Sequence, residues 1–149
     1  MSHYNIAIGS DHGGYELKTA ILEHLKKRDP FLDMYTCRVV DFGCHNTESV
    51  DYPDYAQAVC NTINASNDVG ILVCGTGIGI SIAANRHSHI RAGLCHNTET
   101  AKLTRQHNNA NVLCLGGRVT SVEDAIKIVD TFLTTEFEGG RHQKRLDKL

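Results

Sequence analysis

The fold of this chain is decided by the stretch Gly70-Ile71-Leu72-Val73-Cys74-Gly75-Thr76-Gly77-Ile78-Gly79-Ile80-Ser81. Its first part, with Val69 before it, is a short aliphatic run, which predicts a strand buried on both faces. Three glycines then follow at alternate positions, and glycine lets a backbone turn sharply and approach a ligand closely. The residues of 80–85 favour a helix. The sequence therefore predicts a strand, a glycine-rich loop and a helix N-terminus, in that order.

This loop is suited to negative charge, because its N–H groups can point inward and it precedes a helix N-terminus. Cys74 stands where the strand ends, and a thiol in that setting is favoured as the thiolate and can act as a base or a nucleophile. Taken alone, the stretch is equally compatible with a tight strand-to-helix turn that contains a buried cysteine. The rest of the chain favours the functional interpretation.

Short apolar strands alternate with amphipathic helices on both sides of this stretch. Strands are expected at 3–9, 36–42, 69–73, 90–95 and 112–115. Helices are expected at 15–27, 55–63, 80–85 and 98–107, after the cap Ser121, and in a tail over about 138–149, with a break at Asp29-Pro30. This order predicts an α/β fold: a three-layer, Rossmann-like, doubly wound sheet of about five parallel strands, in a single domain over 1–149.

Composition narrows the class of protein. The 149 residues are 41% hydrophobic and 21% charged, which is typical of a soluble globular protein, and the net charge of −2 gives no support to nucleic-acid binding. No apolar run approaches the roughly 20 residues of a membrane span, and no signal peptide is visible. The six cysteines form no C-x-x-C pair and the nine histidines lack zinc spacing. We therefore expect a cytoplasmic protein with free thiols, no metal, no cofactor and no membrane partner.

Ligands bind doubly wound sheets outside the carboxyl ends of the strands, where the strand order reverses. Ionisable residues gather at the expected strand ends: Asp11, His12, Asp41, Cys74, His96 and Arg118. A nucleotide-binding module fits poorly, since the first turn, 9–14, is not G-x-G-x-x-G and the loop after Cys74 lacks a Gly-Lys-Ser/Thr ending. A small-molecule site is therefore expected at this edge of the sheet.

Six motifs occur together and in order along the chain. They are Ile8-Gly9-Ser10-Asp11-His12-Gly13-Gly14, Asp51-Tyr52-Pro53, the loop 74–79 with Ser81-Ile82-Ala83-Ala84-Asn85, Arg105-Gln106-His107-Asn108, Gly116-Gly117-Arg118, and Gly140-Arg141-His142-Gln143-Lys144-Arg145. With these motifs the sequence closely resembles the type B ribose-5-phosphate isomerases, which share a fold family with the galactose-6-phosphate isomerase subunits. The resemblance covers nearly the whole chain and is weakest over 29–36.

The resemblance implies metal-independent interconversion of ribose 5-phosphate and ribulose 5-phosphate through an enediolate, with no cofactor. It makes Cys74 the base; the position where some relatives carry a carboxylate base is Ile80 here, which supports the thiol. It makes His107 the residue that opens the sugar ring. The N–H groups of the loop would stabilise the enediolate oxygen, and these belong to Gly75, Thr76, Gly77, Ile78 and Gly79.

The resemblance also implies the residues that hold the substrate. Arg118, Arg141 and Arg145 match anion ligands, and Asn108 matches a substrate contact. Asp11 and His12 match sugar-binding residues, Tyr52 is expected in the pocket wall, and Ser81 and Thr76 are expected to contact sugar hydroxyls, Thr76 at the catalytic centre.

Structural explanations stand beside several of these assignments. His107 could serve the helix dipole alone, and Arg141 and Arg145 could form a solvated helix face. Asp11 and His12 could simply cap the first helix, and Tyr52 could belong to the core. Ser81 could be a helix-start hydroxyl, and Thr76 needs no special role in a loop.

Two classes of function remain in view at this point. One is a sugar-phosphate isomerase acting on ribose 5-phosphate or on a hexose 6-phosphate such as allose or galactose 6-phosphate. The other is a non-catalytic module that binds a sugar phosphate or nucleotide. The thiol at a strand end favours the enzyme. The resemblance further implies a homodimer, with tetramers in some members, in which both subunits contribute to each site.

Overall fold

The structure is a computed structural model that describes residues 2–29 and 32–149. Pro30, part of the predicted break after the first helix, lies outside the described residues. The strands are β1 (Ser2–Ser10), β2 (Tyr35–Asp41), β3 (Asp68–Cys74), β4 (Ala92–Leu94) and β5 (Val112–Gly116). The helices are the 3-10 turn η1 (His12–Gly14), then α1 (Tyr15–Lys26), α2 (Tyr52–Cys60), α3 (Ile78–Asn85), α4 (Thr98–Asn108), α5 (Val122–Thr134) and α6 (Arg141–Leu146).

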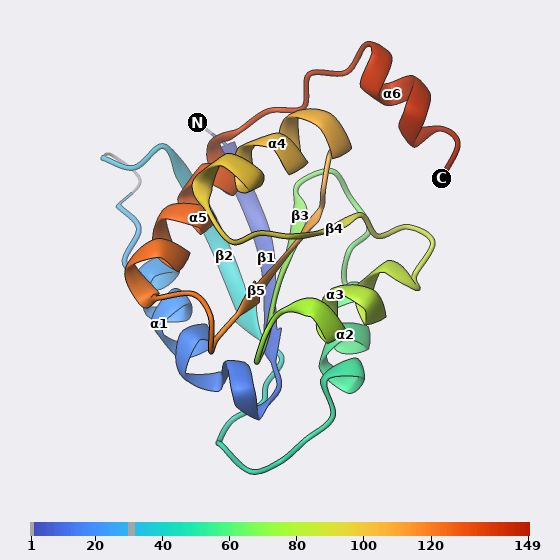
Figure 1. Cartoon of the computed structure of the whole chain (residues 1–149). Coiled ribbons are helices and arrows are strands. Elements are labelled where there is room, and N and C mark those ends of the chain that lie inside the picture. Colours follow the sequence, from blue (N-terminus) through green and yellow to red (C-terminus); the bar gives the residue numbers. More distant parts are fainter. Residues whose placement is uncertain (1, 30–31) are drawn as a thin grey trace.

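The five strands form one sheet in the order β2-β1-β3-β5-β4, and all neighbours are parallel (Figure 1). The prediction of an α/β fold with a five-stranded parallel sheet is confirmed. The chain moves from β1 to one side to form β2, and β3 lies on the other side of β1. The strand order therefore reverses between β1 and β3, and a ligand site is expected outside their carboxyl ends.

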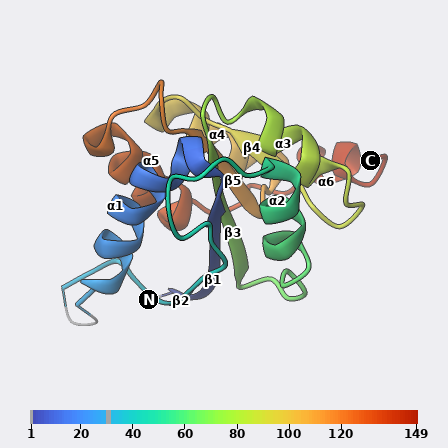
Figure 2. The same ribbon diagram turned by 90° about the horizontal axis from the view of Figure 1, so that it is seen from below.

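Helices cover both faces of the sheet (Figures 1 and 2). One buried cluster joins the sheet to α1, α5 and Ala101 of α4, and another joins it to α2 and α3. The two clusters alternate along β3: Ile71 and Val73 face α1 and α5, whereas Leu72 and Cys74 face α2 and α3. From Val69 onward the strand carries no polar side chain and is buried on both faces, as its sequence predicts.

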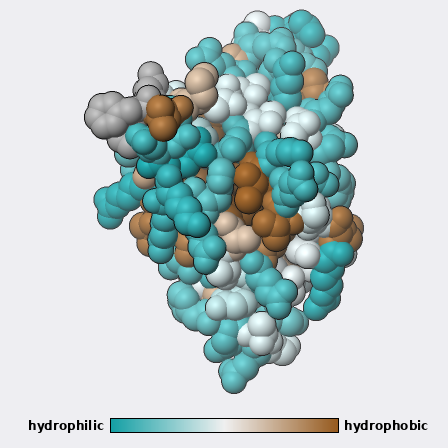
Figure 3. All heavy atoms as spheres, turned by 90° about the vertical axis from the view of Figure 1, so that its left-hand side faces the viewer, coloured by the Kyte–Doolittle hydropathy of each residue, from teal (hydrophilic) through white to brown (hydrophobic). Residues whose placement is uncertain are grey.

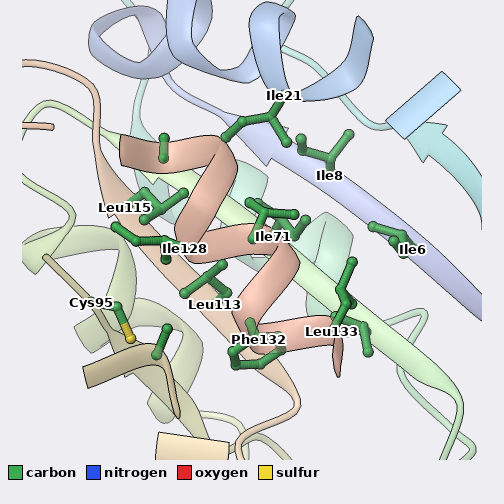
Figure 4. Packing of buried hydrophobic residues seen from close by; sticks show 14 of the residues in the cluster. Ile6, Ile8, Ile21, Ile71, Cys95, Leu113, Leu115, Ile128, Phe132 and Leu133 are labelled. Carbon is green, nitrogen blue, oxygen red and sulfur yellow. The ribbon is translucent and has the colours of Figure 1, made fainter. Parts of the chain in front are cut away.

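Figure 4 shows the first of these clusters in detail. Ile71 and Leu113, from neighbouring strands, lie beneath α5, from which Ile128, Phe132 and Leu133 point toward the sheet. Ile21 of α1 belongs to the same cluster, on the same face of the sheet as α5. This packing fixes the strands whose ends carry the site.

Several element boundaries differ from the sequence-based expectation, and three of these differences have a clear local cause. Helix α2 begins at Tyr52 rather than at 55, because Pro53 lies in its first turn, where the missing N–H is tolerated. Helix α3 begins at Ile78 rather than at 80, since Gly77 adopts a positive φ of 81° and turns the chain into the helix two residues earlier. Strand β4 covers only Ala92–Leu94 of the expected 90–95, because it pairs with β5 alone at the edge of the sheet.

The side of the molecule on the left of Figure 1, where α1 and α5 lie, is mostly hydrophilic with a hydrophobic patch in its middle (Figure 3). Within the described residues, no helix is both long and apolar enough to cross a membrane.

Candidate active site

Cys74 ends β3 with its side chain at the start of the glycine-rich loop. The thiol is 4% exposed, and its Sγ accepts a hydrogen bond from the Gly77 N–H at 3.1 Å. The Gly77 backbone can turn in this way because φ is 81°, in the left-handed region that glycine tolerates. The loop therefore places a backbone donor directly on the sulfur, at the point where the strand ends.

Four other cysteines are in settings that keep them protonated. Burial raises the pKa of Cys60 and of Cys95 to about 11, and it also raises the pKa of Cys114 and of Cys37 above the usual range of a thiol. None of these four is expected to ionise near neutral pH. These four thiols are therefore poor candidates for a catalytic base.

Part of the loop's hydrogen-bonding capacity is already used. Thr76 Oγ1 accepts from the Ile78 N–H at 3.2 Å, and Ser81 Oγ donates to the Ile78 carbonyl at 2.7 Å. These contacts suit the structural explanations for both side chains. The N–H groups of Gly75 and Thr76 have no protein acceptor among the described residues. They are the donors that remain free for an oxyanion in the substrate.

Glycines bring three strand ends together around Cys74. A Cβ on Gly14 would lie 2.5 Å from the carbonyl carbon of Val73, and one on Gly117 would lie 2.6 Å from the carbonyl oxygen of Gly13. A Cβ on Gly75 would lie 3.1 Å from a guanidinium nitrogen of Arg118. The loops after β1, β3 and β5 therefore touch, and Arg118 reaches the loop that follows Cys74.

Asp11 and His12 follow β1 and line the same edge. Asp11 is 8% exposed, and its Oδ1 accepts from the Gly14 N–H at 3.1 Å. The capping explanation is thus correct for Asp11, although it occupies only one carboxylate oxygen. His12 Nδ1 accepts from the Val50 N–H at 3.1 Å, so a neutral His12 carries its proton on Nε2. His12 can therefore donate a hydrogen bond to a ligand from that atom.

Tyr52, at the start of α2, lies over Gly79 at the end of the loop. Its ring packs on Gly79, where a Cβ would lie 2.7 Å from the ring carbon Cζ, and the residue is 38% exposed. It therefore belongs to the rim of the site and not to the core. Asp41, by contrast, is bound to the buried Lys18 at 2.8 Å and to the Gly43 N–H at 2.9 Å. This strand-end carboxylate has a structural role.

The remaining predicted residues lie at the other edge of the sheet. Helix α4 runs back along the sheet, and Arg105 near its end donates to the Ala110 carbonyl, just before β5 begins. His107 and Asn108 follow Arg105, and the Glu138 N–H donates to the Gln106 carbonyl at 3.1 Å, which brings the C-terminal segment to the same place. Figure 1 shows α6 beside the end of α4, away from the loop that joins β3 to α3.

One chain therefore does not bring all predicted site residues together. Strand β3 has 7 residues, which at about 3.3 Å per residue separates the two edges by roughly 20 Å. Asp11, His12, Tyr52, Cys74, the loop 75–79, Ser81 and Arg118 lie at one edge, whereas His107, Asn108, Arg141 and Arg145 lie at the other.

Two residues near His107 were not assigned a role from the sequence. The rings of His107 and His142 stack with centroids 4.3 Å apart, and Glu138 has a carboxylate oxygen 4.0 Å from Nε2 of each ring. His142 is 5% exposed, the most buried of the three. The sequence contains a pattern that could have drawn attention to His142, because this residue lies inside the 140–145 motif. No sequence pattern marks Glu138, because only folding places it next to His107.

The chain matches the family model for ribose/galactose isomerases over residues 6–149. The chain belongs to the ribose/galactose isomerase family. A putative sugar phosphate isomerase of Rickettsia bellii is 51% identical over 100% of this chain and 99% of its own length. Ribose-5-phosphate isomerase B of Escherichia coli is 46% identical over 97% of this chain and 93% of its own length.

Solved structures of family members share the fold over nearly the whole chain. Ribose-5-phosphate isomerase B of Clostridium thermocellum is 50% identical, with a TM-score of 0.88 over 97% of this chain and 93% of that one. The Mycoplasma genitalium enzyme, solved with bound ribulose-5-phosphate, is 47% identical, with a TM-score of 0.88 and the same coverage of 97% and 93%. The resemblance read from the six motifs is thereby confirmed.

Proposed function

We propose that this protein is a ribose-5-phosphate isomerase that interconverts ribose 5-phosphate and ribulose 5-phosphate. The observation that carries the proposal is the bond from the Gly77 N–H to Cys74 Sγ, beside the free N–H groups of Gly75 and Thr76. An aldose–ketose isomerase needs a base next to an oxyanion site, and this loop supplies both. The relatives from Escherichia coli and Mycoplasma genitalium named above support the same substrate.

In the proposed reaction the Cys74 thiolate removes the C2 proton of the open-chain aldose and becomes a thiol. The electron pair of the broken C–H bond forms the C1–C2 double bond of the enediolate, and the negative charge moves to the carbonyl oxygen. The N–H groups of Gly75 and Thr76 stabilise that oxygen. A proton then passes from the C2 hydroxyl to the C1 oxygen. The electron pair of the C1–C2 double bond takes the proton back from the Cys74 thiol at C1, so that the C2 oxygen becomes the ketone carbonyl and the thiolate is regenerated. Every atom and electron is accounted for without a metal or a cofactor.

Substrate binding is divided in this proposal between the two edges of the sheet. Asp11 and His12 hold sugar hydroxyls, with Tyr52, Ser81 and Thr76 at the rim. Arg118, Arg141 and Arg145 hold the phosphate, His107 opens the ring and Asn108 contacts the sugar. Since the edges of one chain are roughly 20 Å apart, we propose a homodimer in which His107, Asn108, Arg141 and Arg145 serve the partner's Cys74 loop.

The surface beside the Cys74 loop suits such a contact. Ile78 and Ile82 lie one turn apart on α3 and are 52% and 56% exposed, and Val119 after β5 is 58% exposed. Large aliphatic side chains gathered next to a site indicate a surface that is covered by a partner. The protein is proposed to act in the cytoplasm, in the pentose phosphate pathway, with no nucleic-acid or membrane partner.

An assay of the purified protein with ribose 5-phosphate, followed by the appearance of ribulose 5-phosphate, tests the proposal. Allose 6-phosphate and galactose 6-phosphate are compared at equal concentration, and the proposal expects the pentose phosphate to give the highest kcat/KM. Faster turnover of a hexose phosphate would reassign the substrate within the family. Saturable binding of ribose 5-phosphate without turnover would identify a non-catalytic module instead.

A further inference from the structure

His107, Glu138 and His142 form a cluster that could ligate a metal. One ligand atom from each of the three lies within 4.8 Å of the other two, and within the described residues no other group of three or more such side chains is found. The cluster is assembled from the end of α4, the segment before α6 and α6 itself. Sequence spacing does not reveal the whole cluster, because Glu138 and His142 are spaced i, i+4 but only the fold brings His107 to them.

The environment of His142 points to a ligand. Its Nε2 is buried and has no hydrogen-bond partner among the described residues, since the nearest Glu138 oxygen is 4.0 Å away. Desolvation, followed by the positive charges of Arg141 and His107, lowers the pKa of His142, while Glu138 opposes the shift. The geometry is the decisive feature, because a buried imidazole nitrogen without a partner has its lone pair available to a cation in this cluster.

We propose that His107, Glu138 and His142 bind a divalent transition-metal cation of the zinc type. Two imidazoles and one carboxylate are a ligand set that zinc accepts, with a fourth position left for water. The rings are now stacked with planes 16° apart, so their in-plane lone pairs run nearly side by side. Binding must turn the rings so that both lone pairs converge, and the soft χ2 torsion of histidine permits this. Glu138 and His107 are partly exposed and free to close on the ion.

The bound cation would oppose the isomerase reaction. This part of the inference rests on the proposed function, in which His107 exchanges a proton with the sugar ring. A metal on that imidazole removes the lone pair that accepts the proton. Zn²⁺ therefore inhibits turnover of cyclic ribose 5-phosphate, and a chelator restores it.

Calorimetric titration of the full chain with Zn²⁺ tests the site without reference to activity. One Zn²⁺ per chain is expected, and Glu138→Gln or His142→Ala weakens binding by about tenfold or more, since even the loss of a supporting contact has that effect. The matched control is His45→Ala, because His45 faces Asp41 at 3.9 Å, outside the cluster, and should keep full affinity. Should buried His142→Ala fail to fold, the partly exposed Glu138→Gln and His107→Ala decide the question.

Titration with Co²⁺ identifies the ligands. Nitrogen and oxygen ligation gives visible d–d bands alone, whereas a cysteine ligand adds an intense thiolate charge-transfer band in the near ultraviolet. Absence of that band, with d–d bands lost in Glu138→Gln, supports the proposal. A thiolate band, equal Zn²⁺ affinity in Glu138→Gln and the parent, or no binding of Zn²⁺ would overturn it. If Zn²⁺ binds as expected but turnover does not change, the site stands and the role of His107 fails.

Discussion

At the scale of single residues, the hydrogen bond from the Gly77 N–H distinguishes Cys74 as the candidate base. Replacing Cys74 by alanine should leave the fold intact, because only one sulfur is removed beside a loop that carries its own backbone contacts. We expect kcat to fall by roughly 10²–10⁴, the usual contribution of a general base, with little change in substrate binding. Cys74→Ser should also be poor, since a hydroxyl hardly ionises near neutral pH.

Exchange of the substrate C2 hydrogen with solvent, followed by NMR, checks the same prediction. In Cys74→Ala, exchange should stop together with turnover. Continued exchange in this variant would place the base elsewhere, with Asp11 as the next candidate, because one of its carboxylate oxygens is not used by the Gly14 cap. Cys60→Ala is the matched control: burial raises the pKa of that thiol to about 11, so its loss should not affect proton transfer.

Some features of single residues could be predicted from the sequence and others could not. The position of Cys74 at a strand end could be predicted, because an aliphatic run followed by alternate glycines is a local pattern. The internal bonds of Thr76, Ser81 and Asp11 could not, since a hydroxyl or carboxylate near a helix start can face either the backbone or a ligand. Only the three-dimensional structure shows which of these partners a side chain has, and here each of the three side chains has at least one backbone partner.

At the scale of elements, the close contact of η1 with β3 depends on Gly14. A Cβ there would lie 2.5 Å from the Val73 carbonyl carbon, and a backbone group cannot move aside as a flexible side chain does. Gly14→Ala should lower the free energy of unfolding by about 1–3 kcal/mol or more, as forced overpacking does. Urea unfolding measures this loss as a lower midpoint at an unchanged m-value.

Gly139→Ala is the comparison for that experiment. Gly139 has a φ of 69° and nothing within 4 Å of its Cβ position, so alanine there carries only the left-handed backbone penalty of about 1–2 kcal/mol. If Gly14→Ala lowered the free energy of unfolding no more than Gly139→Ala does, the contact between η1 and β3 would not be the cause.

The alternation of strands and helices was predictable from the sequence because period-2 and period-3.6 patterns are local. Three of the shifted boundaries were set instead by Pro53, the turn at Gly77 and edge pairing of β4.

Helix α6 presents Arg141 and Arg145 one turn apart, and neither makes an ion pair with a described residue. Two free guanidiniums on one side can hold a phosphate dianion together. Arg141→Ala or Arg145→Ala should raise KM for ribose 5-phosphate by the loss of a charged hydrogen bond, about 1.5–3 kcal/mol. Lys144→Ala removes the same charge from the same helix and should have little effect. Equal losses in all three variants, or turnover of unphosphorylated ribose at the same rate, would contradict the assignment.

At the scale of the whole molecule, the two groups of site residues lie at opposite edges of one sheet. The doubly wound topology requires this, because α4 returns from the carboxyl edge to the amino edge before β5 begins. The motifs named the candidates of both groups, but their separation of roughly 20 Å is a property of chain direction that no motif contains. The active site that we propose combines both groups and therefore needs a second copy of the chain.

Mixing two inactive variants tests this arrangement. Cys74→Ala removes the proposed base at one edge, and His107→Asn removes the proposed ring-opening group at the other. In a dimer with shared sites, a mixed pair has one site that lacks both groups and one site that is intact. Random exchange of subunits makes half of the dimers mixed, so about a quarter of the parent activity should return.

Each variant incubated alone gives the baseline, and sedimentation before and after mixing shows that subunits have exchanged. Exchange without recovery would mean that Cys74 and His107 do not meet across an interface, and a fully active monomer would exclude the shared site altogether.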